Sequence, residues 1–353
     1  EPGTFKDRVL LNRHADGVFD GMTIAARIVE ADKGFLYLRA EYAYLREKIE
    51  RILQSRRDAG LLGSDILGVQ GFDFDIEVRM GAGAYICGEE SALIESLEGK
   101  RGIPRRRPPF PVSQGYLDRP TLVNNVETFM AAALITIHGA EWFRSTGTAQ
   151  SSGSKILSIS GDCERRGIYE YPYGTSIEQV LQDCGARDTQ AVQVSGAAGI
   201  TLRPAEFQRR LAFEDIATAG SFMVFNQQRD LLEVVRNFTR FFRHESCGFC
   251  TPCRVGNSLL SDLMDKLHNG HATPYDLDEM RTIGELMRSS SHCGLGKTAA
   301  NPLLDTLRKF PQLYEQRLRK STYEPAFDLD AALQEARDIS GRDDPASHIR
   351  HET

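Results

Sequence analysis

The sequence lacks the features of a nucleic-acid-binding or membrane-spanning protein. Its 43 Lys and Arg residues are outnumbered by 49 Asp and Glu, which gives a formal net charge of -6. No excess of positive charge is therefore available to hold a nucleic-acid backbone. The longest strictly apolar stretch, 129–135, falls far short of the ~20 residues that a bilayer-spanning helix needs. We exclude nucleic acid as a partner and direct insertion into a membrane.

The chain also lacks a signal peptide and an even number of cysteines. Seven cysteines cannot all pair, which favours a reducing compartment where cysteines bind metals or fill the core. We expect the cytoplasm. The 353 residues, 41% hydrophobic and 26% charged, are typical of a globular protein of two or three domains. The chain opens at Glu1 without Met, so we expect it to be a piece of a longer protein.

Hydrophobic periodicity predicts an α/β organisation for residues 1–147, which we take as the first domain. Residues 72–80 show the period-two pattern of a half-buried strand, and other segments show helical spacing. The order of helix and strand is typical of an α/β domain. We expect strands at 35–38 and 72–80, helices at 16–33 and 45–60, and two more helices ending near Gly99 and Gly139.

Strand signals dominate residues 148–226, and helical signals dominate residues 227–320. A Ser- and Gly-rich linker is expected at 149–154, and Thr175 with Glu178 predicts a capping box for a helix at 176–184. An α+β unit would then have strands at 155–160, 168–171, 191–195 and 221–225. A four-helix bundle would have helices at 230–244, 254–268, 276–288 and 300–319. Residues 321–353 are expected to be a surface tail with one short helix near 328–339.

The cysteine spacing carries the strongest chemical signal. Cys247, Cys250 and Cys253 form a C-x2-C-x2-C motif at the start of a predicted helix, and Cys293 lies 40 residues further on. Three such thiolates can surround one face of a cubane, and a fourth from another loop completes the ligation of a [4Fe-4S] cluster. Structural zinc is the alternative, but zinc sites usually pair two distant two-ligand knuckles. The remaining three cysteines have no partner in sequence and are taken as core filler: Cys87, Cys163 and Cys184.

A second candidate site is the run Gly81–Glu90, between a predicted strand and a predicted helix. It departs from the G-x-G-x-x-G pattern because Ile86 holds the third glycine position. Glu89 and Glu90 lie at the start of the helix, where two negative charges would repel a phosphate. With Tyr85, they could instead line the edge of a nicotinamide or flavin ring. The alternative is ordinary helix N-terminal charge without a ligand.

The segment 100–110 is basic and rich in proline. Taken alone, it is most simply a solvated basic loop, although it could hold Phe110 out as a stacking platform for a base, with cations nearby for a pyrophosphate. Further on, Asn125 is a plausible N-cap for the helix that ends near Gly139, which leaves Asn124 spare.

Taken together, these motifs resemble the flavin-bearing, NADH-oxidising subunit of respiratory complex I. The resemblance rests on E-P-G-T-F-K-D-R at 1–8, G-A-Y-I-C-G-E-E at 83–90, P-P-F-P at 108–111, N-N-V-E-T at 124–128 and E-S-C-G-F-C-T-P-C-R at 245–254. The segments 292–296 and 325–333 look most like the diaphorase subunit of soluble NAD-dependent nickel-iron hydrogenases. NAD-dependent formate dehydrogenase has a similar subunit.

The resemblance implies a multidomain α/β fold with a Rossmann-like flavin domain, a β-grasp-like α+β domain and a helical bundle holding the cluster. It implies that Gly88, Glu89 and Glu90 lie beside the flavin and nicotinamide and that Tyr85 lines the pocket. Phe110 would stack on the adenine. Asn124 and Asn125 would contact FMN, and Glu1 would contact the dinucleotide. The four cysteines of the two motifs would bind the cluster.

The function implied is that of a cytoplasmic diaphorase, an oxidoreductase subunit that exchanges hydride between NAD(H) and FMN and single electrons with a [4Fe-4S] cluster. Glu90 would be the catalytic residue on the nicotinamide side. The implied partners are a [2Fe-2S] thioredoxin-like subunit and further iron–sulfur subunits leading to a hydrogenase or formate dehydrogenase module. The family's glycine-rich phosphate loop is absent, so we expect flavin retention to need residues upstream of Glu1. The rival function is a structural subunit that holds the cluster without flavin.

Overall fold

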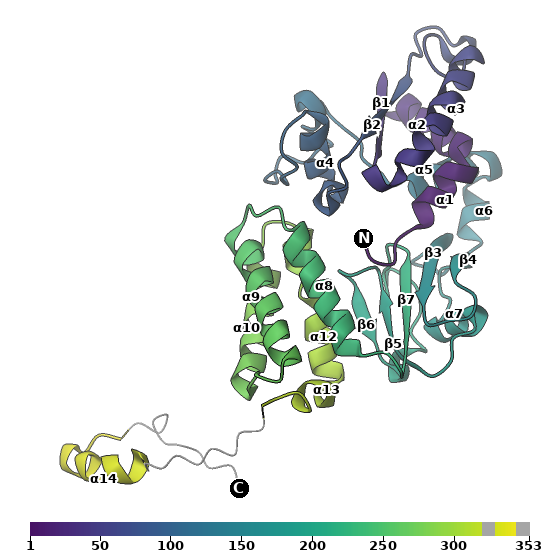
Figure 1. Ribbon diagram of the computed structural model, residues 1–353. Coiled ribbons are helices and arrows are strands. Elements are labelled where there is room, and N and C mark those ends of the chain that lie inside the picture. Colours follow the sequence, from purple (N-terminus) through teal and green to yellow (C-terminus); the bar gives the residue numbers. More distant parts are fainter. Residues whose placement is uncertain (320–328, 344–353) are drawn as a thin grey trace. The chain divides into compact units, whose positions relative to one another are not determined.

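The computed structural model describes residues 1–319 and 329–343 (Figure 1). Residues 1–318 form one compact unit. The helix expected near 328–339 is present as α14 (Leu329–Ser340), whereas the rest of the expected surface tail lies largely outside the described residues. No helix in the described part of the chain is long and apolar enough to cross a membrane.

The first region is built on two parallel strands, β1 (Lys33–Leu38) and β2 (Asp75–Met80). The expected strand at 72–80 is shorter than predicted, because Phe74 instead forms an isolated antiparallel bridge with Gly63. Ile76 is buried while Asp75 is exposed, as the period-two pattern requires. The surrounding helices are α1 (Lys6–Arg13), α2 (Ala15–Val29), α3 (Arg46–Asp58), α4 (Glu90–Leu97), α5 (Val126–His138) and α6 (Ala140–Arg144).

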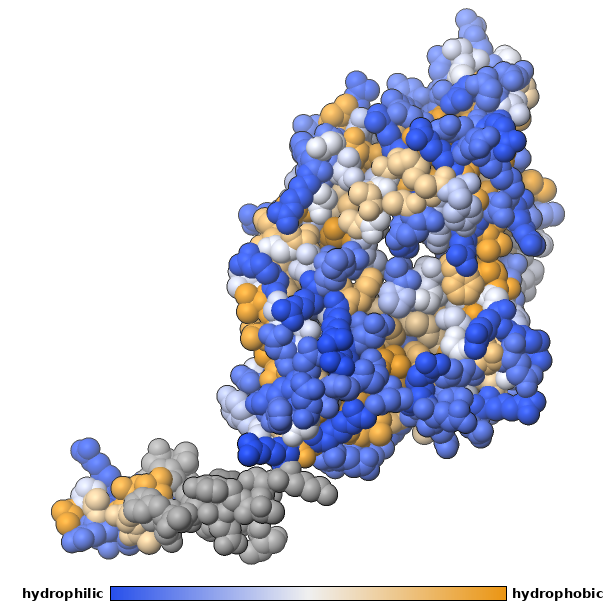
Figure 2. Space-filling view, viewed as in Figure 1, coloured by the Kyte–Doolittle hydropathy of each residue, from blue (hydrophilic) through white to orange (hydrophobic). Residues whose placement is uncertain are grey.

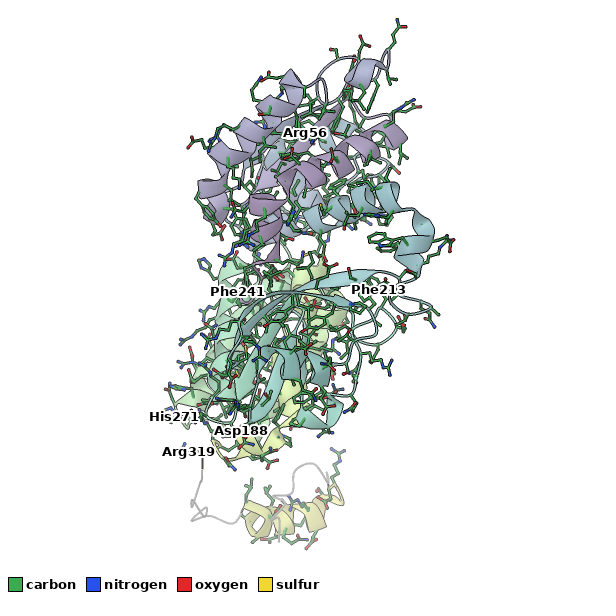
Figure 3. The ribbon with its side chains drawn as sticks, turned by 90° about the vertical axis from the view of Figure 1, so that its right-hand side faces the viewer. Arg56, Asp188, Phe213, Phe241, His271 and Arg319 are labelled. Atoms are coloured by element: carbon green, nitrogen blue, oxygen red, sulfur yellow. The ribbon has the colours of Figure 1, made fainter. Side chains whose placement is uncertain are left out.

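Buried charge holds α3 to α2. Arg56 on α3 is 5% exposed (Figure 3), and its guanidinium donates to Asp20 at 2.6 Å and to Asp16 at 3.3 Å. Both carboxylates lie on α2. Since a buried guanidinium without anionic partners is costly, this pairing fixes how the two helices pack.

The second region is a five-stranded sheet with the order β4-β3-β7-β5-β6. Strands β3 and β7 are parallel, and the other neighbours are antiparallel. The sheet and the helix α7 (Ile177–Cys184) share one hydrophobic core. The strands are β3 (Ser154–Gly161), β4 (Gly167–Pro172), β5 (Thr189–Val194), β6 (Ile200–Leu202) and β7 (Ser221–Asn226).

Two local predictions in this region are wrong. The helix α7 is capped by Ser176, whose hydroxyl accepts from the Gln179 N–H at 3.2 Å, while the Thr175 hydroxyl donates to the carbonyl of Pro172. The N-cap is therefore shifted by one residue, and the expected capping box of Thr175 and Glu178 is not formed. The segment 149–154 is a tight turn with a buried Ser151 and a Gly147–Ser152 bridge, not an open linker.

The third region is helical. Figure 1 shows α8 (Leu231–Glu245), α9 (Thr251–His268), α10 (Pro274–Ser290) and α12 (Asn301–Lys309) side by side. The helix expected at 300–319 is broken, with α12 followed by the separate helix α13 (Pro311–Glu315). The break falls at Phe310 because a residue before proline is disfavoured in the helical conformation. The short α11 (Gly294–Thr298) precedes α12.

The bundle surface is predominantly polar in the view of Figure 2, where hydrophilic side chains cover much of the helices. The apolar side chains of α8, among them Phe238 and Phe242, instead face the interior. This segregation follows from the amphipathic pattern of the helix.

Candidate functional site

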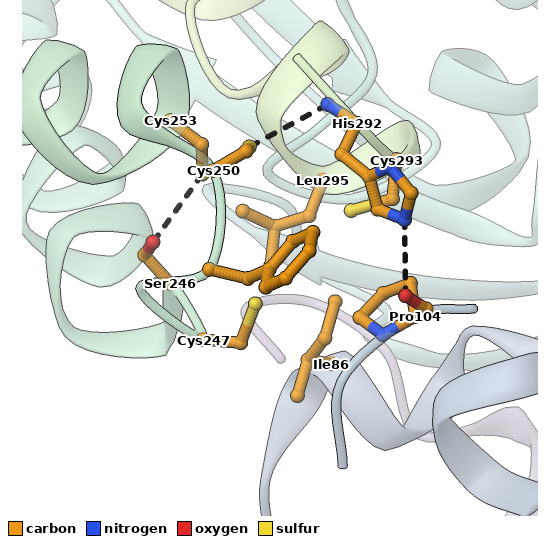
Figure 4. A pocket seen from close by; sticks show the side chains of 10 residues that line it. Ile86, Pro104, Ser246, Cys247, Cys250, Cys253, His292, Cys293 and Leu295 are labelled. Carbon is orange, nitrogen blue, oxygen red and sulfur yellow. Dashed lines mark hydrogen bonds between the residues drawn. The ribbon is translucent and has the colours of Figure 1, made fainter. Parts of the chain in front are cut away.

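Four cysteines from two segments line one pocket (Figure 4). Cys247 and Cys250 lie in the loop between α8 and α9, Cys253 lies in the first turn of α9, and Cys293 precedes α11. Pro252 fits the first turn of α9 because a helix start needs no N–H there. The pocket encloses about 260 Å³ of space between protein atoms, part of it open to solvent. We refer to these four side chains as the thiol site.

The donor set of the thiol site, four cysteine thiols on one pocket, is the set that a [4Fe-4S] cubane takes. Within residues 1–319 and 329–343, no three His, Cys, Asp or Glu side chains converge closely enough to hold one metal ion. A cubane needs wider spacing because each thiolate binds a different iron. The sulfurs also face hydrogen-bond donors, since the His292 N–H points to Cys250 Sγ at 3.5 Å. Donors of this kind suit metal-bound thiolates.

Without a bound metal, the thiols of Cys253 and Cys293 favour the protonated form. Burial raises the pKa of the Cys253 thiol, and the hydrogen bond with Ser246 lowers it; with the added effect of the three neighbouring cysteines, the pKa becomes about 11. Burial likewise raises the pKa of Cys293, although N–H groups at the start of α11 oppose the shift. Metal binding at this site must therefore displace protons.

The run Gly81–Glu90, which we call the carboxylate turn, forms a short 3-10 helix followed by α4. Glu89 is the N-cap of α4, and its Oε2 accepts from the N–H groups of Ser91 at 3.1 Å and Ala92 at 3.0 Å. Glu90 is the first residue of α4. Both glutamates therefore lie at the helix start, as predicted, and one of them has a structural role there.

The glutamates are not two bare charges, because Arg107 pairs with both. Its Nη2 contacts Oε1 of Glu89 and lies 2.9 Å from Oε1 of Glu90. The same guanidinium lies 6.0 Å from the centre of the Phe110 ring, which is 51% exposed. The sequence alone does not single out Arg107, because a basic, proline-rich segment is most simply a solvated loop. The available signal in the sequence is a run of arginines that follows two adjacent glutamates along the chain.

A second arginine of the same loop is also paired. Arg105 Nε donates to Glu95 at 2.5 Å, and its Nη2 donates to Glu98 at 2.8 Å. Its Nη1 donates to the carbonyl of Gly115. The interpretation of a simple solvated loop is thus wrong for Arg105 and Arg107, and these pairs fix the loop that carries Phe110.

The carboxylate turn and the thiol site are in direct contact. The N–H of Tyr85 donates to Oε2 of Glu245 on α8 at 2.9 Å, and the Tyr85 ring lies 5.1 Å from the ring of Phe241, labelled in Figure 3. Ile86, the next residue of the turn, lines the cysteine pocket. Ile86 is therefore part of both the carboxylate turn and the wall of the cysteine pocket.

Two further contacts close this junction. Arg101 donates to the carbonyl of Cys247 at 2.6 Å. The ring Nε2 of His292 lies 3.0 Å from the carbonyl oxygen of Pro104, as Figure 4 shows. Because both contacts use the loop after α4, this loop holds the cysteine segments against the first region.

The other predicted residues lie in different environments. Burial raises the pKa of Glu1, whose carboxylate lies near the turn at Gly196. The pKa of Tyr85 is also raised, first by burial and then by the charges of Glu1 and Glu245. Asn125 is the N-cap of α5 and accepts from the N–H of Glu127. Asn124 is exposed, and no hydrogen bond of its side chain is found among the described residues.

Two known families match this chain, one that binds flavin and one that binds an iron–sulfur cluster. Residues 1–134 match the Nuo51 FMN-binding domain. Residues 233–317, which contain the whole thiol site, match the NADH-ubiquinone oxidoreductase-F iron-sulfur binding region.

Individual relatives agree with this class. The alpha subunit of the NAD-reducing hydrogenase HoxS of Cupriavidus necator is 54% identical over 94% of this chain and 56% of the relative. An NADH-quinone oxidoreductase subunit of Aquifex aeolicus is 36% identical over 92% of this chain and 77% of the relative. A crystal structure of an NAD+-reducing [NiFe]-hydrogenase in its H2-reduced state superposes with a TM-score of 0.86 at 48% identity, covering 99% of this chain and 60% of that one.

The chain belongs to the family that unites these NADH-quinone oxidoreductase subunits with the related subunits of NAD-reducing hydrogenases. The resemblance inferred from the sequence motifs is thereby confirmed. The chain spans only a little over half the length of the HoxS subunit and of the hydrogenase chain that it matches.

Proposed function

We propose that the chain is the diaphorase subunit of a soluble NAD-reducing hydrogenase, transferring electrons between NAD(H) and an acceptor. The observation that supports this most directly is the junction of the two candidate sites. Ile86 belongs to the carboxylate turn and lines the cysteine pocket. We infer that an electron carrier at each site would exchange electrons across this junction.

When bound, FMN would exchange a hydride with NAD(H) and single electrons with a [4Fe-4S] cluster. The cluster ligands would be Cys247, Cys250, Cys253 and Cys293. Glu90 would act on the nicotinamide side, while Glu89 fixes the start of α4 through its backbone contacts. The exposed ring of Phe110 is available to stack on a base. The remaining residues assigned to cofactor binding are Glu1, Tyr85, Gly88, Asn124 and Asn125.

The finer architecture belongs to the same proposal. We place a Rossmann-like flavin domain at 1–147, a β-grasp-like domain at 148–226, a helical cluster domain at 227–320 and a tail at 321–353. One hydrophobic cluster lies within the first of these ranges and another within the second, whereas the cluster of the helical range also includes residues of the other two. A cytoplasmic location and a [2Fe-2S] thioredoxin-like partner leading to a hydrogenase module complete it.

The test is to purify the natural complex that contains this chain and to analyse its cofactors and subunits together. We expect FMN, about four iron and four sulfide per chain, and bleaching of visible absorbance on anaerobic addition of NADH. Mass spectrometry should find hydrogenase subunits. Zinc without iron would contradict the cluster, and iron without flavin would favour a structural subunit. Formate dehydrogenase or complex I subunits would instead reassign the partner module.

A further inference from the structure

One corner of the thiol site has an unusual number of hydrogen-bond donors. Asn257 lies one helical turn after Cys253 on α9 and is 1% exposed. Its Nδ2 is 3.3 Å from Cys253 Sγ and 2.9 Å from the Cys253 carbonyl oxygen. The amide therefore offers its two hydrogens to the sulfur and the backbone of a single ligand residue.

Ser246, the residue that follows α8, approaches the same sulfur. Its Oγ lies 3.3 Å from Cys253 Sγ, as drawn in Figure 4. While the thiol keeps its proton, either atom could donate. A metal-bound cysteine is a thiolate without a proton, so the Ser246 hydroxyl must then be the donor.

A third polar group is buried nearby without a partner. The hydroxyl of Ser291 is buried and finds no hydrogen-bond partner among the described residues. Ser291 Oγ and Cys253 Cβ both lie within 3 Å of the point where a Cβ on Gly296 would stand. Glycine at 296 thus permits the close approach of these two residues. A buried polar group without a partner is costly. The Ser291 hydroxyl could therefore donate to an acceptor atom that a bound cluster supplies.

The other ligands are less richly supplied. Cys250 Sγ has the single N–H of His292 at 3.5 Å, and the Cys293 thiol has N–H groups of the α11 start. No hydrogen bond to Cys247 Sγ is found in the described part of the chain. Side-chain donors are therefore concentrated on Cys253.

We propose that Asn257 and Ser246 are positioning residues that set the reduction potential of the cluster through their hydrogen bonds to Cys253 Sγ. This inference rests on the proposed function, because it requires a cluster at the thiol site. Reduction makes the cluster and its thiolates more negative, so a donor to sulfur stabilises the reduced state more than the oxidised state. The buried position of Asn257 strengthens the effect, since little water screens it.

The test uses the full chain in its natural complex, with the cluster retained, and measures the midpoint potential by redox titration followed by electron paramagnetic resonance. Asn257→Leu removes the donor at similar volume, and Ser246→Ala removes the hydroxyl. We expect each to disfavour reduction about tenfold, which corresponds to 59 mV for one electron. Ser246→Thr keeps a hydroxyl and should stay near the parent.

The matched control is Ser258→Ala, next to Asn257 on α9, because its exposed hydroxyl donates to the Arg254 carbonyl and has no other partner among the described residues. Its potential should not move. If the Asn257→Leu protein loses its iron, the midpoint potential of the Ser246→Ala protein tests the inference by itself. A cluster-bearing Ser246→Ala protein with an unchanged potential overturns the inference. Absence of iron from the parent protein would instead overturn the proposed function, so the two failures are distinguishable.

Discussion

The thiol site and the carboxylate turn differ in how their chemistry is built. Three thiols come from seven consecutive residues, and a short helix start delivers the fourth against them. The carboxylate turn is also contiguous, but its charge is balanced by Arg107, which lies 17 residues beyond Glu90 in an irregular loop. The first site is therefore defined by local spacing and the second by a loop that folds back on it.

Removing one cysteine thiol should have the largest effect. A small effect on iron content would contradict the view that local spacing defines the thiol site. Cys293→Ala takes away the one proposed ligand outside the C-x2-C-x2-C motif, and we expect loss of nearly all iron and acid-labile sulfide. The matched control is Cys87→Ala, since Cys87 is buried but does not line the cysteine pocket. Iron analysis of both variants checks this. Retention of iron in Cys293→Ala with loss in Cys87→Ala would reassign the ligands.

Removing Arg107 should have the next largest effect. Arg107→Ala leaves two adjacent, partly buried carboxylates without a cation, and these would repel the phosphates of a dinucleotide. We expect kcat/KM for NADH-dependent dye reduction to fall. The loss of transition-state stabilisation should be about 3 kcal/mol, in the lower part of the range for removing one partner of a charge pair. Arg106→Ala is the control, because Arg106 is exposed and no ion pair of its side chain is found among the described residues. Equal kinetics of the two variants would show that Arg107 is only a surface charge.

The same contrast explains how much the sequence could predict. The convergence of Cys247, Cys250 and Cys253 on one pocket was predictable from their spacing, because three cysteines within seven residues can surround one face of a bound group. The N-cap Asn125 and the helix start at Glu90 also followed from local chemistry. Arg107 could not be predicted, since nothing local determines which acid a loop cation meets. Asn257 and Ser246 were missed for a related reason: their roles depend on the approach of two segments to one sulfur.

Replacing Glu90 tests whether the charge of the carboxylate turn acts on the nicotinamide. Glu90→Gln keeps the shape of the side chain but removes the charge that Arg107 contacts at 2.9 Å. We expect NADH-dependent dye reduction to change by ~1 to 3 kcal/mol, the range of a charged hydrogen bond. FMN content must be measured in the same sample. Unchanged kinetics with full flavin would remove Glu90 from the nicotinamide side.

The smallest expected effect concerns Glu98, which anchors the loop that carries Arg107. Burial acts to raise the pKa of Glu98, but hydrogen bonds outweigh it and lower the pKa from 4.5 to about 2. The donors are Lys100, the Leu117 N–H and Arg105. A carboxyl with a lowered pKa in the folded state stabilises the fold fully above pH 4.5, and this contribution is lost as the pH falls toward 2.

Glu98→Gln should therefore lower the free energy of unfolding at pH 7 by about 1 kcal/mol, the usual value of a net hydrogen bond, and by less at pH 3. Urea titrations at both pH values, followed by the fluorescence of the single tryptophan, Trp142, measure the difference. The exposed pair of Arg144 and Glu141 supplies the control, because Glu141→Gln removes an ion pair that water already screens. A Glu98 effect that is equal at both pH values would mean that its charge does not anchor the loop. The pairing of Arg107 with the carboxylate turn would then depend on the packing of the loop alone.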